Sequence, residues 1–233
     1  MSPRTPRTGA RVAAANQARA PRTAGANRRD PERMRQRILN AATREFAQHG
    51  FAGARVEAIS RRAGTVDRML YYHFGNKAQL YYAVLAACYE QLGSAEQSLD
   101  LQHLTPSAAI ERLVAFTWEY YLANPEFIQL LSGENLLGGA LVKRVRSLTQ
   151  LSSPLIDILR EILRRGADCG EFRADADPVK MYLSIAALGY FYLSNRHTLS
   201  RFLGYDLMAS AAREQWVAHA TAMVLAYLRS ETI

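Results

Sequence analysis

Cysteine is scarce in this chain of 233 residues: there are two, Cys88 and Cys169, and they lie far apart. Two such residues form neither a disulfide framework nor a metal-binding quartet, so we expect no structural metal and no disulfide. A reducing cytoplasm is the simplest setting for a chain of this kind.

Long apolar runs are also missing. The longest candidates, LYYAVLAAC and MYLSIAALGYFYL, are well short of the roughly 20 residues that a helix needs to cross a bilayer. Residues 1–29 contain no continuous apolar stretch, so we expect no secretory signal. These absences predict a cytoplasmic protein without a membrane partner.

Catalytic and cofactor-binding motifs are absent from the sequence. It contains no glycine-rich phosphate loop, no His-Glu-x-x-His, no Cys-x-x-Cys and no Gly-x-Ser-x-Gly. His103 and His219 are isolated, and Asp175 and Asp177 stand where a helix is expected to begin, so capping explains them. We therefore expect no catalytic residue, no metal and no cofactor, with an enzyme carrying a binding head as the alternative.

Acidic residues are scarce near the N-terminus. Residues 1–30 contain seven arginines and one acid, and residues 31–80 contain nine basic and four acidic residues. Together they carry a charge of +11. Since the net charge of the whole chain is +8, the remaining 153 residues carry −3. A basic segment joined to a mildly acidic body predicts a polyanionic partner for the first part only. A charged, solvated surface is the alternative.

The composition and the signals for helix ends divide the chain into three segments. Residues 1–30 have few large apolar side chains and cannot bury enough surface to offset the entropy of ordering, so we expect a disordered basic tail. Asp30 and Pro31 can start the first helix, and Gly50 can end it. Residues 31–80 are then expected to form a small head, and residues 81–233 a larger body.

The fold class predicted for this chain is all-α, with about nine helices. Apolar residues recur at helical spacing, and no alternating strand pattern with hairpin turns is present. Helices are expected near residues 31–50, 55–63, 67–74, 76–95, 105–124, 125–135, 136–149, 154–169, 177–204 and 207–229. Asn76 can cap the fourth of them, and Thr105 with Pro106 can start the fifth.

The stretch AGTVDRMLYYHFGNKAQL, residues 63–80, combines a turn glycine with basic and aromatic residues. Gly64 permits the left-handed backbone that a tight turn needs. In the short helix that follows, Val66, Leu70 and Phe74 are spaced by four and are expected to point inward. Two helices joined by such a turn, with polar and aromatic residues outside, form a helix-turn-helix, whose second helix can enter the major groove of DNA.

The longer stretch GFAGARVEAISRRAGTVDRMLYYHFGNKAQL resembles the DNA-binding domain of the TetR family of bacterial transcriptional regulators. The resemblance covers about residues 33–85 and rests on Gly50-Phe51, Ile59, Ala63-Gly64 and above all LYYHFGNKAQL. It implies an obligate homodimer whose helical C-terminal domain binds a small molecule, and usually repression of transcription. Residues 31–80 would then be the DNA-binding domain, and residues 81–233 the effector-binding and dimerisation domain.

The chain departs from the family pattern inside this motif. Family members commonly have Ala-Gly-Val-Ser-x-Gly-Thr-Leu-Tyr where this chain has AGTVDRMLY. Val66 stands in place of a capping serine, so Thr65 is expected to cap the helix instead. Arg68 and Met69 replace two small residues, and Arg55 replaces a threonine. These changes are compatible with the fold and leave the base preference open.

The second helix of the motif and its flanks supply the candidate DNA contacts. Tyrosine hydroxyls, His73 and Lys77 can bond phosphates, which fix register, whereas Arg68 can pair with a guanine edge or reach a phosphate. Tyr71 could instead be half core, and His73 a packing residue. The complete predicted set is Arg55, Thr65, Arg68, Met69, Tyr71, Tyr72, His73 and Lys77.

The body is rich in aromatic residues that share helices with polar ones. Helical bodies of this kind can build ligand cavities between helices, and the resemblance implies such a pocket. An ordinary core position is the alternative for each aromatic ring. The candidate walls are Trp118, Tyr121 and Phe127, and the candidate polar groups are Glu134, Asn135, Asn195 and His197.

The last two helices are expected to pair across a two-fold axis. The first contains small residues at Ser184, Ala186, Ala187 and Gly189, and the second presents Met208, Ala212, Trp216 and Leu225. A buried monomer core is the alternative.

The leading hypothesis is a ligand-responsive repressor that a small molecule releases from a double-stranded DNA operator. An activator with the same parts and a nucleoid-style architectural protein are the competing readings.

Overall fold

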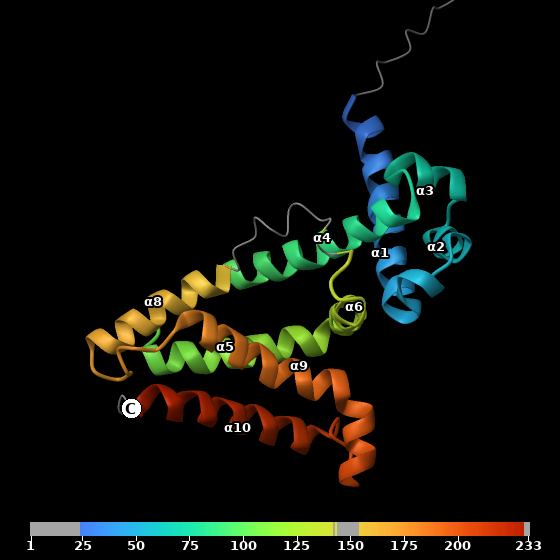
Figure 1. Cartoon of the computed structure of the whole chain (residues 1–233). Helices are drawn as coiled ribbons and strands as arrows, with labels where there is room; N and C mark the ends of the chain where they lie inside the picture. The colour runs from blue at the N-terminus through green and yellow to red at the C-terminus, as the bar shows by residue number, and fades with distance from the viewer. Residues whose placement is uncertain (1–23, 142, 144–153, 231–233) are drawn as a thin grey trace, which may run out of the picture.

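Nine α-helices and no strand make up the part of the chain that the computed structural model describes, residues 24–141, 143 and 154–230 (Figure 1). The predicted all-α class and the approximate number of helices are confirmed. Residues 1–23, which hold most of the expected basic tail, lie outside the described residues. Most of the helix expected near residues 136–149 does too.

The helices divide into a head and an elongated body (Figure 1). The head consists of α1 (Ala24–Gly53), α2 (Val56–Ala63) and α3 (Asp67–Phe74), with the start of α4 (Lys77–Gln97) packed beneath them. The body continues from α4 with α5 (Pro106–Ala123), α6 (Pro125–Leu136), α8 (Pro154–Asp168), α9 (Pro178–Leu203) and α10 (Ser210–Arg229). None of the described helices is both long and apolar enough to cross a membrane.

Helix α1 begins earlier than expected, and the expected end at Gly50 is a break inside it. Its first residue is Ala24 rather than Pro31, and Pro31 lies inside it. Alanine and arginine, which are frequent just before Pro31, are strong helix formers, and the expectation of a start at Asp30 gave them too little weight. Gly50 adopts φ 65° and ψ 177° and interrupts the helix, which continues for one more turn to Gly53.

Three helices begin with the caps expected from the sequence. The side chain of Asn76 accepts a hydrogen bond from the Gln79 amide at 2.9 Å. Asp177 accepts from the amide of Val179 at 2.7 Å, and Thr105 caps α5 in the same manner. Such bonds satisfy amides that have no partner inside the helix.

The expected cap at Thr65 is wrong. The residue before α3 is Val66, which has an extended backbone and offers no side-chain hydrogen bond. Asp67 in the first turn instead complements the helix dipole.

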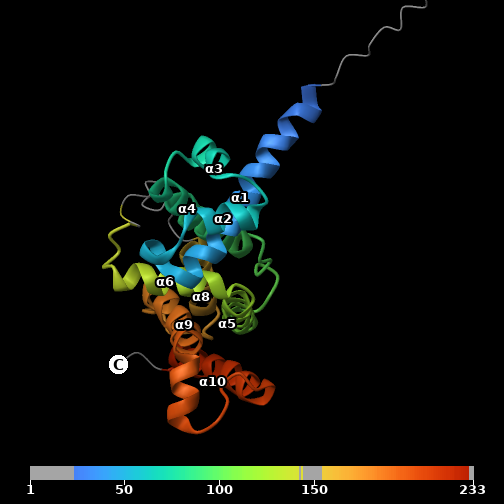
Figure 2. The same ribbon diagram turned by 90° about the vertical axis from the view of Figure 1, so that its right-hand side faces the viewer.

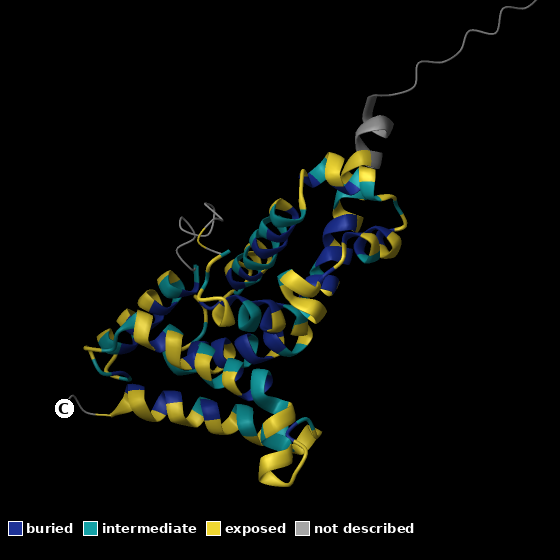
Figure 3. Ribbon diagram, turned by 45° about the vertical axis from the view of Figure 1, so that its right-hand side comes forward, coloured by how far each residue is buried: buried dark blue, intermediate teal, exposed yellow. Residues whose placement is uncertain are grey.

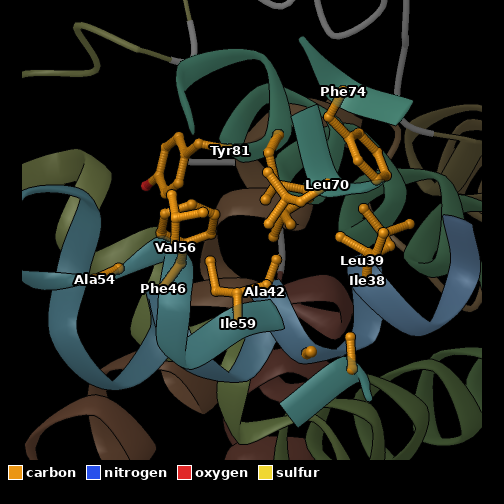
Figure 4. Close-up of a cluster of buried hydrophobic side chains, with 14 of the residues drawn as sticks. Ile38, Leu39, Ala42, Phe46, Ala54, Val56, Ile59, Leu70, Phe74 and Tyr81 are labelled. Carbon is orange, nitrogen blue, oxygen red and sulfur yellow. The ribbon is translucent and has the colours of Figure 1, made fainter. Parts of the chain in front are cut away.

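The core of the head joins α1, α2, α3 and α4 around fully buried side chains (Figure 4). Phe46 is 1% exposed in this core, and its ring lies 4.9 Å from that of Tyr81 in an edge-to-face arrangement. The same cluster continues into Val84 and Leu85 of α4 and Leu130 of α6. The expected boundary at residue 80 therefore falls inside a helix and inside one continuous core.

Helix α6 connects the head to the body. It lies between the C-terminal end of α1 and helix α9 in both views (Figures 1 and 2). The hydroxyl of Tyr81 on α4 donates to the buried carboxylate of Glu134 on α6 at 2.8 Å. This bond adds a polar link between head and body to the apolar contacts around Leu130.

Gly64 is the residue on which the turn between α2 and α3 depends. Its φ of 63° lies in the left-handed region, and its amide closes α2 by donating to Arg61 O at 3.2 Å. We expect Gly64→Ala to lower the free energy of unfolding by about 1–2 kcal/mol, because alanine is strained at positive φ. Its new Cβ would also meet the guanidinium of Arg37.

Urea unfolding followed by circular dichroism measures this loss. Gly93→Ala is the control, since Gly93 lies inside α4 and an added Cβ would make only ordinary contacts. A Gly64→Ala variant as stable as the control would contradict the role given to this backbone.

Candidate nucleic-acid interface

The helix-turn-helix forms as the sequence predicts, with α3 held by its inner face. Ile59 and Ala63 of α2 and Leu70 and Phe74 of α3 are buried in the head core. The amide of Thr65 donates to Ser60 O at 3.0 Å and fixes the turn between the helices. These contacts set the orientation of α3 and leave its other face free of the core.

The prediction that Val66 points inward is wrong. Val66 is 63% exposed. It precedes the helix in an extended conformation, so helical spacing does not apply to it. Leu70 and Phe74, which lie inside α3, follow the expected spacing.

The outer face of α3 carries three of the predicted contact residues, Arg68, Tyr71 and Tyr72, as exposed side chains. Figure 3 colours the ribbon by this exposure. Tyr72 is 77% exposed and Tyr71 is 47% exposed, so Tyr71 is not a half-core residue. Arg68 is also exposed, whereas Met69 is half-buried. An exposed helix face with two phenolic hydroxyls and a guanidinium can donate hydrogen bonds to phosphates and base edges.

His73 and Lys77 are less free than the tyrosines. The Nε2 atom of His73 is buried and has no hydrogen-bond partner among the described residues, and its ring packs edge-on against Tyr72 at 5.2 Å. Lys77 Nζ donates to Ala52 O at 3.4 Å and lies 5.1 Å from the centre of the Phe51 ring. Both side chains would have to turn to reach DNA, and their phosphate contacts stay a prediction.

Arg55 and Thr65 flank α2. Arg55 is exposed, and its amide donates to Glu45 Oε1 at 3.3 Å, which ties the start of α2 to α1. Thr65 is half-buried. Their contacts with DNA also stay predictions.

The structure adds two arginines of α1 to the basic surface beside α3. Arg37 Nη2 reaches Gly64 O at 3.5 Å, and the Arg35 guanidinium lies 5.2 Å from the centre of the Phe74 ring. Sequence reasoning did not select them. The partners are 27 and 39 residues away in the chain, and no local pattern marks such contacts.

Models of known families match both parts of the chain. The model described as bacterial regulatory proteins, tetR family, matches residues 38–84. The model described as tetracyclin repressor-like, C-terminal domain, matches residues 106–224. The chain belongs to the TetR family. It is therefore a DNA-binding transcriptional regulator, as the resemblance in residues 33–85 implies.

Individual relatives agree with this assignment. The transcriptional repressor NicS of Pseudomonas putida is 41% identical over 89% of this chain and 98% of its own length. The repressor SCO4008 of Streptomyces coelicolor is 36% identical over 46% of this chain and 53% of its own.

Solved structures of transcriptional regulators share the fold. SCO4942 of Streptomyces coelicolor has a TM-score of 0.62 at 25% identity, over 82% of this chain and 97% of that one. The hemolysin II regulator HlyIIR has a TM-score of 0.59 at 20% identity, over 86% and 99%.

The seven predicted effector contacts of this TetR-family regulator fall into an aromatic group and a polar group in the described part of the chain. Tyr121 stacks on Phe127 at 5.9 Å, and Trp118 packs edge-on against Tyr192 at 5.2 Å. All three predicted walls are buried in one aromatic cluster. The structure therefore brings the rings together as packed core, and any role in binding an effector stays a prediction.

The four predicted polar groups lie elsewhere. Glu134 is bonded to Tyr81. The amides of Asn135 and Asn195 donate to carbonyls of their own helices, at Leu131 and Phe191. His197 is exposed and lines a groove between head and body. Helical spacing did not reveal that the side-chain amides of the two asparagines are already hydrogen-bonded to carbonyls of their own helices.

Buried tyrosines give the body a predictable response to high pH. Burial raises the pKa of Tyr120 to about 12 and raises that of Tyr89 and Tyr121 as well. The unfolded chain releases these protons near pH 10, before the folded chain does. The unfolded state then binds fewer protons, so stability is complete below about pH 10 and falls as the pH rises above it.

We expect the free energy of unfolding to fall by about 1.4 kcal/mol per pH unit above pH 10 for each such tyrosine. Urea midpoints between about pH 8 and 11 measure the slope. Tyr121→Phe, which keeps the ring and removes the ionisable hydroxyl, should make it shallower. A flat profile in the parent chain would contradict this account.

The outer face of α9 and α10 is the candidate dimer surface. It exposes Leu183 and Phe191 of α9 and Met223 and Tyr227 of α10. A groove of about 750 Å³ between the helices has small residues, Ser184 and Ala187, in its lining. A contiguous apolar face of this kind marks an interaction surface.

Two residues expected on this surface lie inside the body instead. Leu225 is buried in the core of α5, α8, α9 and α10. Gly189 is buried too, and a Cβ added there would approach Tyr121 to 3.1 Å, so its small size serves internal packing. On α10 the exposed residues of this face are Met223 and Tyr227, and the expected Trp216 also lines the groove, so the pairing surface stays a prediction.

Proposed function

We propose that this TetR-family regulator is a homodimeric repressor that a small-molecule effector releases from its DNA operator. The observation that carries the proposal is the exposed face of α3, with Arg68, Tyr71 and Tyr72, on a head whose core is shared with the body. The relative NicS, similar over 89% of the chain, is named a repressor. A cytoplasmic location follows, because the operator lies there.

The proposed dimer forms through the apolar face of α9 and α10. A closed two-fold assembly buries the same surface on both copies and holds two copies of α3 at a fixed separation. Helix-turn-helix dimers bind half-sites one helical turn of DNA, or a multiple of it, apart. The separation of the two heads then decides whether the operator fits.

The proposed release depends on α4 and α6. A conformational change in the body would reach the head by two routes, the continuous helix α4 and helix α6. Helix α6 packs on α1, and its Glu134 accepts a hydrogen bond from Tyr81. An effector shifts the equilibrium only by the difference between its affinities for the DNA-binding and released states.

Selection of bound duplexes from random-sequence DNA, with light scattering of the free protein, tests the proposal. The expected result is a two-fold symmetric consensus bound by a dimer. Addition of metabolites to that complex should then identify an effector that lowers affinity. A monomer with no preference among duplexes would overturn the proposal, and a site whose occupation raises transcription would identify an activator.

A further inference from the structure

A groove of about 560 Å³ opens at the junction between head and body. One wall is the C-terminal end of α1 with Phe46 and Phe51, and Tyr81 of α4 stands beside it. The facing wall comes from α6, including Ile128 and Leu136, and from the C-terminal half of α9. This volume lies within the range of about 300–1,000 Å³ that is typical of small-molecule sites.

The polar groups that line the groove are neutral or basic. They are His49, Gln129, Ser132, Ser194, Arg196 and His197, and no aspartate or glutamate belongs to the lining. Arg196 Nη1 donates to Leu193 O at 2.6 Å, which anchors the guanidinium at the wall. A guanidinium has five N–H donors, so further donors remain for a ligand.

Two nearby acids are already engaged with the protein. Glu134 is buried and accepts the hydroxyl of Tyr81. Glu45 lies 3.9 Å from His49 Nε2 and also accepts the amide of Arg55. His49 is therefore matched by a carboxylate, and Arg196 and His197 provide the donors at the α9 end of the groove.

We propose that this groove binds a small organic anion, a carboxylate attached to an aromatic or branched apolar body. Phe51, Leu136 and Leu137 would cover the apolar body, because Phe46 and Ile128 are almost fully buried behind the surface of the groove. The carboxylate would accept hydrogen bonds from Arg196 and His197. Arginine is well suited to a carboxylate because its planar fork matches both oxygens. The site is separate from the packed aromatic cluster of Trp118, Tyr121 and Phe127.

The position of the groove gives the bound anion a regulatory effect, and this step rests on the proposed function. The ligand contacts the head through α1 and the body through α6 and α9 at the same time. It therefore binds best at one angle between head and body and favours the matching separation of the two reading helices.

Titration calorimetry of the full chain with 1-naphthoate and its uncharged analogue 1-naphthamide tests the binding step. We expect 1-naphthoate to bind at least tenfold more tightly than 1-naphthamide. Arg196→Gln and His197→Gln should each lower naphthoate affinity about tenfold and leave naphthamide affinity unchanged. Arg201→Gln is the matched control, since Arg201 is an exposed arginine of α9 outside the groove.

A second variant fills the groove without harming the fold. Gly133 of α6 lines the groove, and a Cβ added there meets no atom within 4 Å. Gly133→Leu should abolish binding of both compounds, while the chain unfolds at the same or a higher urea concentration because glycine weakens a helix. Glu111→Gln, at an exposed position of α5 outside the groove, should bind both compounds as the parent does.

Four results would overturn the proposal. These are no binding of 1-naphthoate, equal binding of the amide, full affinity in Arg196→Gln and His197→Gln, or full affinity in Gly133→Leu. Operator binding is measured separately with the selected duplex. A chain that selects no operator overturns the proposed function and leaves the groove result standing. Naphthoate that occupies the groove without changing operator affinity overturns the regulatory step alone.

Discussion

Replacing Tyr72 by alanine is expected to lower operator affinity by roughly tenfold to a hundredfold. A hydrogen bond to a charged group contributes about 1.5–3 kcal/mol, and the Tyr72 hydroxyl is the best placed donor on α3 for a phosphate. The side chain is 77% exposed and packs on His73. We therefore expect the free energy of unfolding to change by less than about 0.5 kcal/mol.

Binding to the selected operator and to unrelated duplexes at one fixed salt concentration measures this effect. A phosphate contact carries no sequence information, so Tyr72→Ala should weaken all duplexes alike. Arg68→Ala should instead relax the preference at one base position. Equal losses everywhere for Arg68→Ala would exclude base reading by Arg68, and full affinity of Tyr72→Ala would exclude the phosphate contact.

Tyr72→Phe separates the hydroxyl from the ring. If the hydroxyl carries the contact, Tyr72→Phe should behave like Tyr72→Ala. If the ring carries it, Tyr72→Phe should bind like the parent. Tyr205→Ala is the control for an exposed tyrosine, because Tyr205 is 55% exposed and follows α9, away from α3.

Replacing Phe46 by alanine is expected to destabilise the protein by about 3–5 kcal/mol and to abolish operator binding. Large-to-small changes in a core lose the buried surface and leave a cavity. Phe46 is 1% exposed and contacts the rings of Phe51 and Tyr81. Its loss removes the centre of the core that holds α2 and α3.

Urea unfolding measures the stability loss, and Leu228→Ala provides a matched control. Leu228 of α10 is fully buried in the body cluster, away from the head. Both variants should lose stability, but Leu228→Ala should keep operator binding at concentrations where it stays folded and dimeric. A loss below about 1 kcal/mol for Phe46→Ala would contradict the central position given to this ring.

Most features that depend on near neighbours in the chain were predicted from the sequence, although the cap at Thr65, the inward position of Val66 and the start of α1 were not. The caps at Asn76 and Asp177 are confirmed, as are the break at Gly50 and the buried positions of Leu70 and Phe74. Each is decided within about one helical turn, by backbone geometry or by the 3.6-residue period.

Features that depend on distant residues were not predicted. The bond between Tyr81 and Glu134 spans 53 residues, and Arg37 reaches across 27 residues to Gly64. The groove is built from four separated helical segments, and of the seven predicted effector contacts it includes only His197. The spacing of apolar residues along one helix shows which of its faces is buried, but not which other helix packs against that face.

The core shared by α1, α4 and α6 limits how readily reading heads can be exchanged between relatives. A chimera joined at residue 80 would separate Phe46 from Tyr81, Val84 and Leu85, whose side chains belong to the same cluster. A functional graft must therefore include the first three turns of α4. It also needs a residue at position 130 that packs in the same core as Leu130 does. DNA specificity in such a protein is therefore inherited together with part of its body, and recombination at residue 80 cuts through one hydrophobic core.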